Sequence, residues 1–278
     1  VQRHPDTRIH ALRSDGTVCI VVFNKAEDVK CIVNFTPAGT SASVEDIFVL
    51  PGTTEDAVYY QTKRTINSST KRYIERFALE SECVGGTLNK QADSFILFSG
   101  TAADTITGLS HLVGASVVVW ADGKCLTDAA GDARTFTVSS TGTISPVTGE
   151  GIPVRVTSAC VGLAYTAQYK SSKLAYAAQL GTALGQQKQV EALGLSVYQT
   201  HAQGLKFGPD FVTMRNLPLI ENAKVVGADS IWSQHDFMPI EFPGDINNDA
   251  RVCLQAASPR PATVMALMLA LHTDERRP

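Results

Sequence analysis

Oxygen-bearing side chains at alternate positions give "DINNDARVCLQA", residues 245–256, the opening spacing of a calcium-binding loop. Asp245, Asn247 and Asp249 are the residue types that Ca²⁺ prefers as ligands. The glycine that such a loop needs for its sharp turn is replaced by Ala250, and the bidentate glutamate by Ala256. The pattern therefore favours a loop rich in Asp and Asn between two strands over a calcium site.

Residue pairs that could act in catalysis lack the setting that catalysis needs. His235 precedes Asp236 as a base precedes its orienting carboxylate, but neighbouring residues of a strand point to opposite faces. Glu80 and Glu82 would serve as glycosidase carboxylates only in a cleft, of which the sequence has no sign. No G-x-S-x-G nucleophile elbow is present. No two histidines lie four residues apart on a plausible helix, which leaves zinc without a frame; they are His4, His10, His111, His201, His235 and His272. We predict no catalytic, cofactor-binding or metal-ligating residue, and no enzyme activity.

A basic stretch, "KRTINSSTKRYIER" at residues 63–76, could contact phosphates. Its cations surround Tyr73, an arrangement that suits a nucleic-acid face; they are Lys63, Arg64, Lys71, Arg72 and Arg76. Acidic residues close by, Glu75 and the pair at 55–56, can neutralise them. We favour a solvated strand pair or a contact between subunits, and expect Lys63 and Arg72 to face a neighbouring protein molecule.

Cysteine usage indicates a reducing compartment. The six cysteines form no C-x-x-C pair, and each lies in or beside an apolar run, where a free thiol behaves as a small hydrophobic group; they are Cys19, Cys31, Cys83, Cys125, Cys160 and Cys253. We predict reduced, buried thiols and assembly in a cytoplasm. The glycosylation patterns at Asn34 and Asn67 are then simply strand and turn residues.

The elements that would position these groups are short strands. In residues 7–77, turn-forming segments separate runs rich in β-branched and aromatic residues, at 17–23, 29–35, 43–50, 57–66 and 70–79. Such spacing without helices is typical of β-propeller blades or of a sandwich sheet. Too few strands are present to close a propeller. Because the chain also opens on "VQRHPDTRIHAL" without a start Met or signal peptide, we expect a fragment that lacks an N-terminal portion.

Two further regions follow. Residues 80–107 contain one short apolar patch, 95–98, and are predicted to be a connecting loop, which assigns 1–107 to the first domain. Residues 108–165 contain about five short strands and are predicted to be a separate small antiparallel barrel. It begins with "GLSHLVGASVVVWADGK", 108–124, where Asp122-Gly123 is a hairpin turn. No helix follows these glycines, which argues against a phosphate cradle.

The last region, 166–278, is predicted to be a β domain of the sandwich type. Its ordered candidates are 174–180, 187–200, 204–211, 230–244, 251–257 and 262–275. The composition of "TVMALMLALHT" suits a helix, but the surrounding sequence is all sheet, so we predict a strand there. The whole chain is thus expected to be all-β.

Charge and hydropathy limit the partners. Lys and Arg number 24 against 27 Asp and Glu, giving a formal net charge of −3 and no basic field to hold nucleic acid or anionic lipid. No apolar run reaches the ~18 residues of a membrane span. Charged residues make up 18% and hydrophobic residues 44%, which suggests surface that neighbouring subunits cover.

Three segments carry a resemblance to known proteins. They are 44–86, the stretch at 108–124 quoted above, and 161–211 ("VGLAYTAQYKSSKLAYAAQLGTALGQQKQVEALGLSVYQTHAQGLKFGPDF"). Together they resemble the tail hub or nozzle proteins of short-tailed bacteriophages, similar in role to the packaged-DNA stabilisation protein and to tail tubular protein B. The resemblance covers roughly residues 40–215, and its motifs are structural.

The resemblance implies a propeller region, here incomplete, followed by small β domains of a distal tube. It also implies a homo-oligomeric ring, commonly a hexamer, below the portal and adaptor in the virion, beside a fibre or tailspike. DNA would pass through without specific binding, and a lumen lined with Asp, Glu and uncharged polar residues would suit that role.

Two other classes remain open. A receptor- or carbohydrate-binding tail module would need exposed aromatic residues on one face, and the candidates are Trp120, Tyr165, Tyr169, Tyr198 and Trp232. A tail-associated cell-wall hydrolase would need a carboxylate pair in a cleft.

Overall fold

The chain is all-β, as the sequence predicts. The computed structural model describes residues 1–26, 28–174, 177–178, 181–182, 185–221 and 223–273. Among these there is no α-helix; the structure gives bounds for two short 3₁₀ turns, η1 (Glu80–Glu82) and η2 (Ser110–Leu112). No helix of the described residues is long and apolar enough to cross a membrane. The chain divides into two compact units, Val1–Tyr165 and Thr166–Pro278. The second has the bounds expected for the C-terminal domain.

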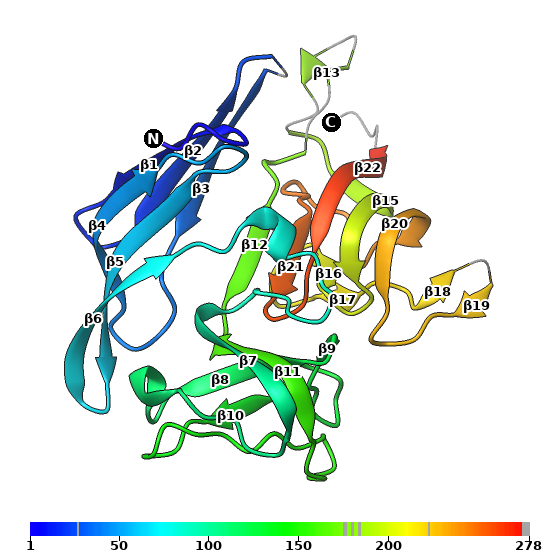
Figure 1. Ribbon diagram of the computed structural model, residues 1–278. Helices are drawn as coiled ribbons and strands as arrows, with labels where there is room; N and C mark the ends of the chain where they lie inside the picture. Colours follow the sequence, from blue (N-terminus) through cyan, green and yellow to red (C-terminus); the bar gives the residue numbers. More distant parts are fainter. Residues whose placement is uncertain (27, 175–176, 179–180, 183–184, 222, 274–278) are drawn as a thin grey trace. The chain divides into compact units, whose positions relative to one another are not determined.

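Unit 1 begins with two three-stranded antiparallel meanders (Figure 1). The first consists of β1 (Thr7–Leu12), β2 (Val18–Asn24) and β3 (Val29–Phe35), and the second of β4 (Ser43–Leu50), β5 (Ala57–Ile66) and β6 (Ser69–Arg76). Five of these six strands lie where β-branched and aromatic runs predict them. β1 was not predicted as a separate strand. That these sheets are blades of an incomplete propeller stays a prediction.

The two meanders pack face to face around an apolar and aromatic core. Val18 of β2 is fully buried against Val44, Val58 and Tyr60 of the second meander. Tyr60 is also ringed by aromatic groups, with Phe77 4.6 Å away between ring centroids. Strand alternation explains the packing, because Val58 and Tyr60 lie two residues apart and therefore on one face of β5.

The rest of unit 1 is an open five-stranded sheet, which corrects the predicted barrel. Its order is β10 (Thr135–Thr137), β8 (Ser116–Ala121), β11 (Val156–Leu163), β7 (Asp93–Ala103), with β9 (Lys124–Cys125) paired to β8. Residues 138–155 supply only single bridges, such as Val147 to Pro153. Pro146 and Pro153 lack the N–H that a continuous strand would donate, which leaves this segment too irregular to close the sheet.

The predicted connector at 80–107 is wrong in its second half. Residues 93–103 form β7, which pairs with β11 along its length. A domain beginning at residue 108 would therefore lack one strand of its own sheet. The core of this sheet also takes in Ile66 from β5. "DSFILFSGTAA" escaped prediction because Ser, Gly, Thr and Ala fill the half after Phe98.

The apolar run at 116–121 makes the hairpin that its sequence predicts. Val117 to Ala121 are buried, and Asp122-Gly123 turns the chain, both residues at positive φ (47° and 83°). The Asp122 carboxylate then reaches β11, where it accepts hydrogen bonds from the backbone N–H and hydroxyl groups of Thr157 and Ser158. The turn is thereby anchored to the central strand of the sheet.

Unit 2 contains two larger sheets and two short hairpins. One sheet has the order β12 (Thr166–Lys170), β21 (Cys253–Ala257), β16 (Leu205–Gly208), β17 (Arg215–Asn216), and the other β20 (Ile231–Glu241), β15 (Lys188–His201), β22 (Thr263–Thr273). The hairpins are β13–β14 (Ala177–Ala178, Gly181–Thr182) and β18–β19 (Ile220–Glu221, Lys224–Val225). Residues of both larger sheets, such as Leu195 and Phe207, share one core. The sandwich itself stays a prediction.

The strand predicted at 262–275 is confirmed over its described part by β22. Every second residue from Leu267 to Leu271 packs against the core, a period of two that a helix would not produce. Residues 274–275 lie outside the described residues, as do 175–176 and 179–180 of the ordered candidate at 174–180.

Replacing Asp122 by Ala should lower the free energy of unfolding of unit 1 by about 1 kcal/mol, since the N–H groups of Thr157, which is exposed, and of Ser158, which is buried, both lose their acceptor. Urea denaturation measures this change. Asp236→Ala, which removes an exposed carboxylate from β20, is the control and should change stability much less. Equal effects of the two changes would contradict the anchoring role.

Asp56 should make unit 1 sensitive to acid. Backbone N–H groups of Arg3, Gly52 and His4 donate to its carboxylate and hold the pKa at about 2, below the ordinary value of 3.8. Because the folded-state pKa is lowered, this stabilisation is complete above pH 3.8 and is lost as the pH falls towards 2. Urea denaturation of the wild type and of Asp56→Asn between pH 6 and pH 2 tests this. The variant should be less stable at pH 6 and should lose less stability on acidification; identical pH profiles would exclude the role.

Candidate functional site

The basic hairpin β5–β6 is the region where the sequence placed a possible phosphate-binding face. In the structure, Lys63, Arg64 and Arg72 of this hairpin contact carboxylates of the chain itself. Lys63 and Arg72 lie opposite one another in the β5–β6 register, and both contact Glu45, with the Arg72 Nε 2.7 Å from its Oε2. Hydrogen bonding by Arg72 lowers the pKa of Glu45. One carboxylate, Glu45, thus contacts both cations; it is not among the acidic residues that the sequence suggested for this role, Glu75 and the pair at 55–56.

Arg64 corrects the idea of a continuous basic face. Its side chain is fully buried, at 0% exposure, and is directed away from the solvent that Lys63 contacts. The signal was present in the sequence: Arg64 lies at the same alternate positions of β5 as Val58, Tyr60 and Ile66, the residues of the buried face.

Each nitrogen of the buried guanidinium has an acceptor. Nε donates to the Ala38 carbonyl oxygen at 2.6 Å, and Nη1 donates to the Thr62 hydroxyl and, at 2.6 Å, to Glu75 Oε1. Nη2 donates to both carboxylate oxygens of Asp93 at 3.1 Å. The planar guanidinium spreads its donors over three nitrogens and therefore reaches a backbone carbonyl, a hydroxyl and two carboxylates at once, which the single nitrogen of lysine could not do with the same geometry.

Both carboxylates that share Arg64 are largely buried, at 19% exposure for Glu75 and 17% for Asp93. Burial raises the pKa of Asp93 despite the adjacent guanidinium and the N–H of Ala38, and the negative charge of Glu75 acts in the same direction as burial. Thr62 donates a second hydrogen bond to Glu75. The cluster links the loop at Ala38, the β5–β6 hairpin and the start of β7, which is the chemistry of a structural ion network rather than of a catalytic pair.

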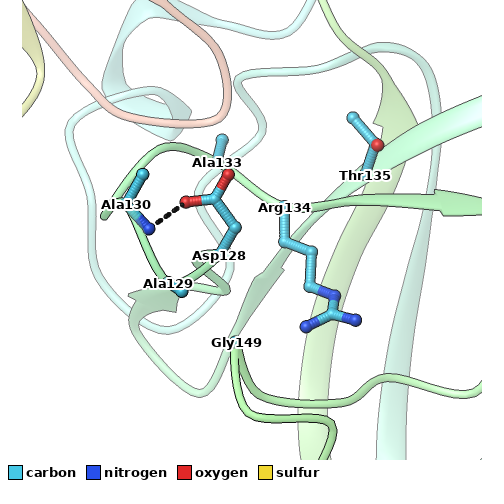
Figure 2. A pocket seen from close by; sticks show the side chains of 7 residues that line it. All are labelled: Asp128, Ala129, Ala130, Ala133, Arg134, Thr135 and Gly149. Atoms are coloured by element: carbon cyan, nitrogen blue, oxygen red, sulfur yellow. Dashed lines mark hydrogen bonds between the residues drawn. The ribbon is translucent and has the colours of Figure 1, made fainter.

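An open hollow in unit 1, with a volume of ≈ 540 Å³, lies beside β10 (Figure 2). Three alanine methyl groups, Thr135 and Gly149 line it with two charged residues, Asp128 and Arg134. Asp128 accepts hydrogen bonds from the N–H groups of Ala130 and Asp132 in its own loop. Arg134 donates to the Thr148 carbonyl and lies over the Phe136 ring. Both charges thus hold loops together, and no nucleophile and base meet among the lining residues.

The calcium reading of residues 245–256 has no support in the side-chain contacts. Asp249 accepts a hydrogen bond from the Arg251 Nε at 2.8 Å, and the Asn247 amide donates to the Asp245 carbonyl oxygen. Residues 245–252 lie in the connection between β20 and β21, and residues 253–256 belong to β21. In the described part of the chain, no group of three or more His, Cys, Asp and Glu side chains could hold a metal ion.

The candidate catalytic carboxylates are engaged in ion pairs. Glu80 pairs with Arg8, and Glu82 pairs with Lys90 and accepts from the Leu79 N–H. Hydrogen bonding by Lys90 lowers the pKa of Glu82, the opposite of what a general acid needs. His235 stacks on Trp232, with ring centroids 5.4 Å apart, while Asp236 is exposed.

The aromatic residues proposed for ligand binding divide into two kinds. Trp120 and Trp232 are buried at 0% and 4% exposure, and the Trp120 Nε1 donates to the Gly86 carbonyl. Tyr165, Tyr169 and Tyr198 are exposed at 39%, 53% and 45%. The indole rings, the strongest stacking groups of the five, are thus inside the cores rather than on a shared face.

The cysteines are all free thiols, and three of them, Cys125, Cys160 and Cys253, are buried. Burial raises the pKa of Cys160 to about 12, which keeps it protonated and unreactive. Cys31 corrects the expectation of burial: it is exposed on β3, while Cys19 and Cys83 are half-buried. Among the described residues β3 pairs only with β2 and is therefore an edge strand of its sheet, which explains the exposure.

No protein-family model matches this chain, and a search of curated proteins finds no match.

Replacing Arg64 by Met should lower the free energy of unfolding by about 3 kcal/mol, because Asp93 and Glu75 keep their burial and lose their cation. Arg72→Met is the matched control: Arg72 is 57% exposed, so its loss should cost less than about 1 kcal/mol. Urea denaturation followed by circular dichroism compares the two. The triple change Arg64→Met, Glu75→Gln, Asp93→Asn should recover part of the loss, and equal effects of the two single changes would refute a special role of Arg64.

Proposed function

We propose that this chain is a structural subunit of a bacteriophage tail. In this proposal it is one copy of a hub or nozzle ring, most simply a hexamer, that forms the distal DNA conduit below the portal and adaptor and contacts a fibre or tailspike. It is assembled in the host cytoplasm, functions in the virion and has no catalysis of its own. The observation that carries the proposal is the resemblance of residues 40–215 to tail hub and nozzle proteins.

The charge distribution supports a conduit. Arg64 is buried between carboxylates, and Lys63 and Arg72 are neutralised by Glu45. With a formal net charge of −3, such a surface would not condense onto phosphates and hold back the DNA that must pass.

The first test is the assembly state of the purified chain. We expect native mass spectrometry to give a closed oligomer, and negative-stain images to show a ring with a central opening. In a gel-shift assay at low salt, we expect the protein not to change the mobility of double-stranded DNA. A monomer at every concentration, or tight salt-dependent DNA binding, would contradict the proposal.

A glycan array separates the proposal from the receptor-binding alternative. Of the five aromatic candidates only the three tyrosines are exposed. We therefore expect no specific binding. Binding that Tyr169→Ala or Tyr198→Ala abolishes would favour the receptor-binding module, and release of fragments from purified peptidoglycan would favour the hydrolase.

A further inference from the structure

The two-meander packing of unit 1 has apolar side chains on its outside as well as its inside. Alternate residues of β1–β3 that face away from the shared core form one row directly across the sheet, Ile9 opposite Val21 and Val21 opposite Ile32. Ile9 and Ile32 are exposed at 44% and 69%, and Phe23, in the next outward position, at 39%. We call this surface the outer face of β1–β3. In a two-sheet packing such positions are ordinarily polar.

The second meander has a matching surface on its own outward side. Phe48 and Tyr59 lie opposite one another and stack with ring centroids 5.0 Å apart. Leu50 on β4 and Ile74 on β6 also point outward, and they are exposed at 53% and 67%. We call this the outer face of β4–β6. Lys63, Arg72 and Glu45 lie at its polar end.

These two outer faces lie on opposite sides of one packing, because the inner faces of the same sheets are in contact with each other. A two-fold contact of like with like would cover one outer face and leave the other exposed. A single head-to-tail contact, repeated from copy to copy, covers both. Heterologous contacts of this kind close into rings when the rotation between copies allows it.

We propose that the outer face of β1–β3 of one copy packs on the outer face of β4–β6 of the next copy, so that the ring continues the sheet stacking already present within each chain. This inference rests on the proposed ring and names its contact. It would also direct Lys63 and Arg72 towards the neighbouring copy.

The area of one outer face indicates how stable a single contact would be. Three strands spaced about 4.8 Å apart and about seven residues long at ~3.3 Å each give a face of about 14 by 23 Å, or ~320 Å². A standard stable interface buries ~800 Å² on each partner. One such contact is therefore weak alone, and the closed ring, in which every copy makes two, is the stable form.

Two glutamate substitutions test the contact, each placing a charge on one outer face. Ile32→Glu and Ile74→Glu should each abolish the oligomer in native mass spectrometry, at a concentration at which the wild type is fully assembled. Val212→Glu is the matched control, since Val212 is an apolar side chain at 93% exposure in unit 2, and it should leave the oligomer intact. Circular dichroism melting verifies the fold of each variant. If Ile32→Glu does not fold, Phe23→Asp on the same outer face takes its place. If Ile74→Glu does not fold, Leu50→Asp takes its place.

Mixing the two variants gives the decisive result. An Ile32→Glu copy keeps an intact outer face of β4–β6, and an Ile74→Glu copy keeps an intact outer face of β1–β3. At the highest soluble concentration the mixture should form a dimer of one copy of each and nothing larger, while each variant alone stays a monomer.

The possible failures are distinguishable. A wild-type ring that survives Ile32→Glu or Ile74→Glu overturns this contact and leaves the proposed ring intact. Loss of assembly in only one of the two variants, or a mixed oligomer larger than a dimer, also overturns the head-to-tail contact. A wild type that is monomeric at every concentration removes the ring of the proposed function and the contact together.

Discussion

Unit 1 depends on a single buried cation. The guanidinium of Arg64 has no exposed surface, and it connects the Ala38 carbonyl, Glu75 of β6 and Asp93 at the start of β7. A buried charge is costly unless its donors are satisfied, and here every nitrogen has an acceptor. The same contacts set where β7 begins, and therefore where the open sheet joins the second meander. Packing alone would not specify that junction, because apolar contacts have no direction.

The strands were predictable wherever one face is buried and the other is not. β5 has a strict alternation of buried and half-buried residues, and β22 has a similar period despite a composition that suits a helix. β7 was missed because Ser99, Gly100 and Thr101 have neither alternation nor bulk. Closure of the predicted barrel could not be judged from local sequence, because it depends on pairing between strands far apart in the chain and on what residues 138–155 do between them.

The ion network was partly predictable and partly not. The parity of Arg64 with Val58 and Tyr60 places its side chain on the buried face, and a buried arginine demands a carboxylate. Glu75 lies opposite Tyr60 and therefore on the same inward face, but Arg64 itself lies opposite Lys71, four residues from Glu75, so the hairpin register places Glu75 on the right face without pairing it to Arg64. Asp93 lies 29 residues from Arg64 in sequence and on another sheet. No spacing rule connects them, so that partner emerges only from the three-dimensional packing.

The charged groups and the apolar groups of unit 1 are arranged in opposite ways. Charges that the sequence suggests for outside partners are turned inward or paired within the chain, as Arg64, Arg72 and Glu82 show. Apolar side chains such as Ile32 and Ile74 are left outside, where water makes them costly. For a monomer, leaving these apolar side chains exposed has no advantage. In the proposed ring both features would be useful. The exposed apolar side chains would be buried against neighbouring copies, and the locally paired charges would not attract the phosphates of DNA.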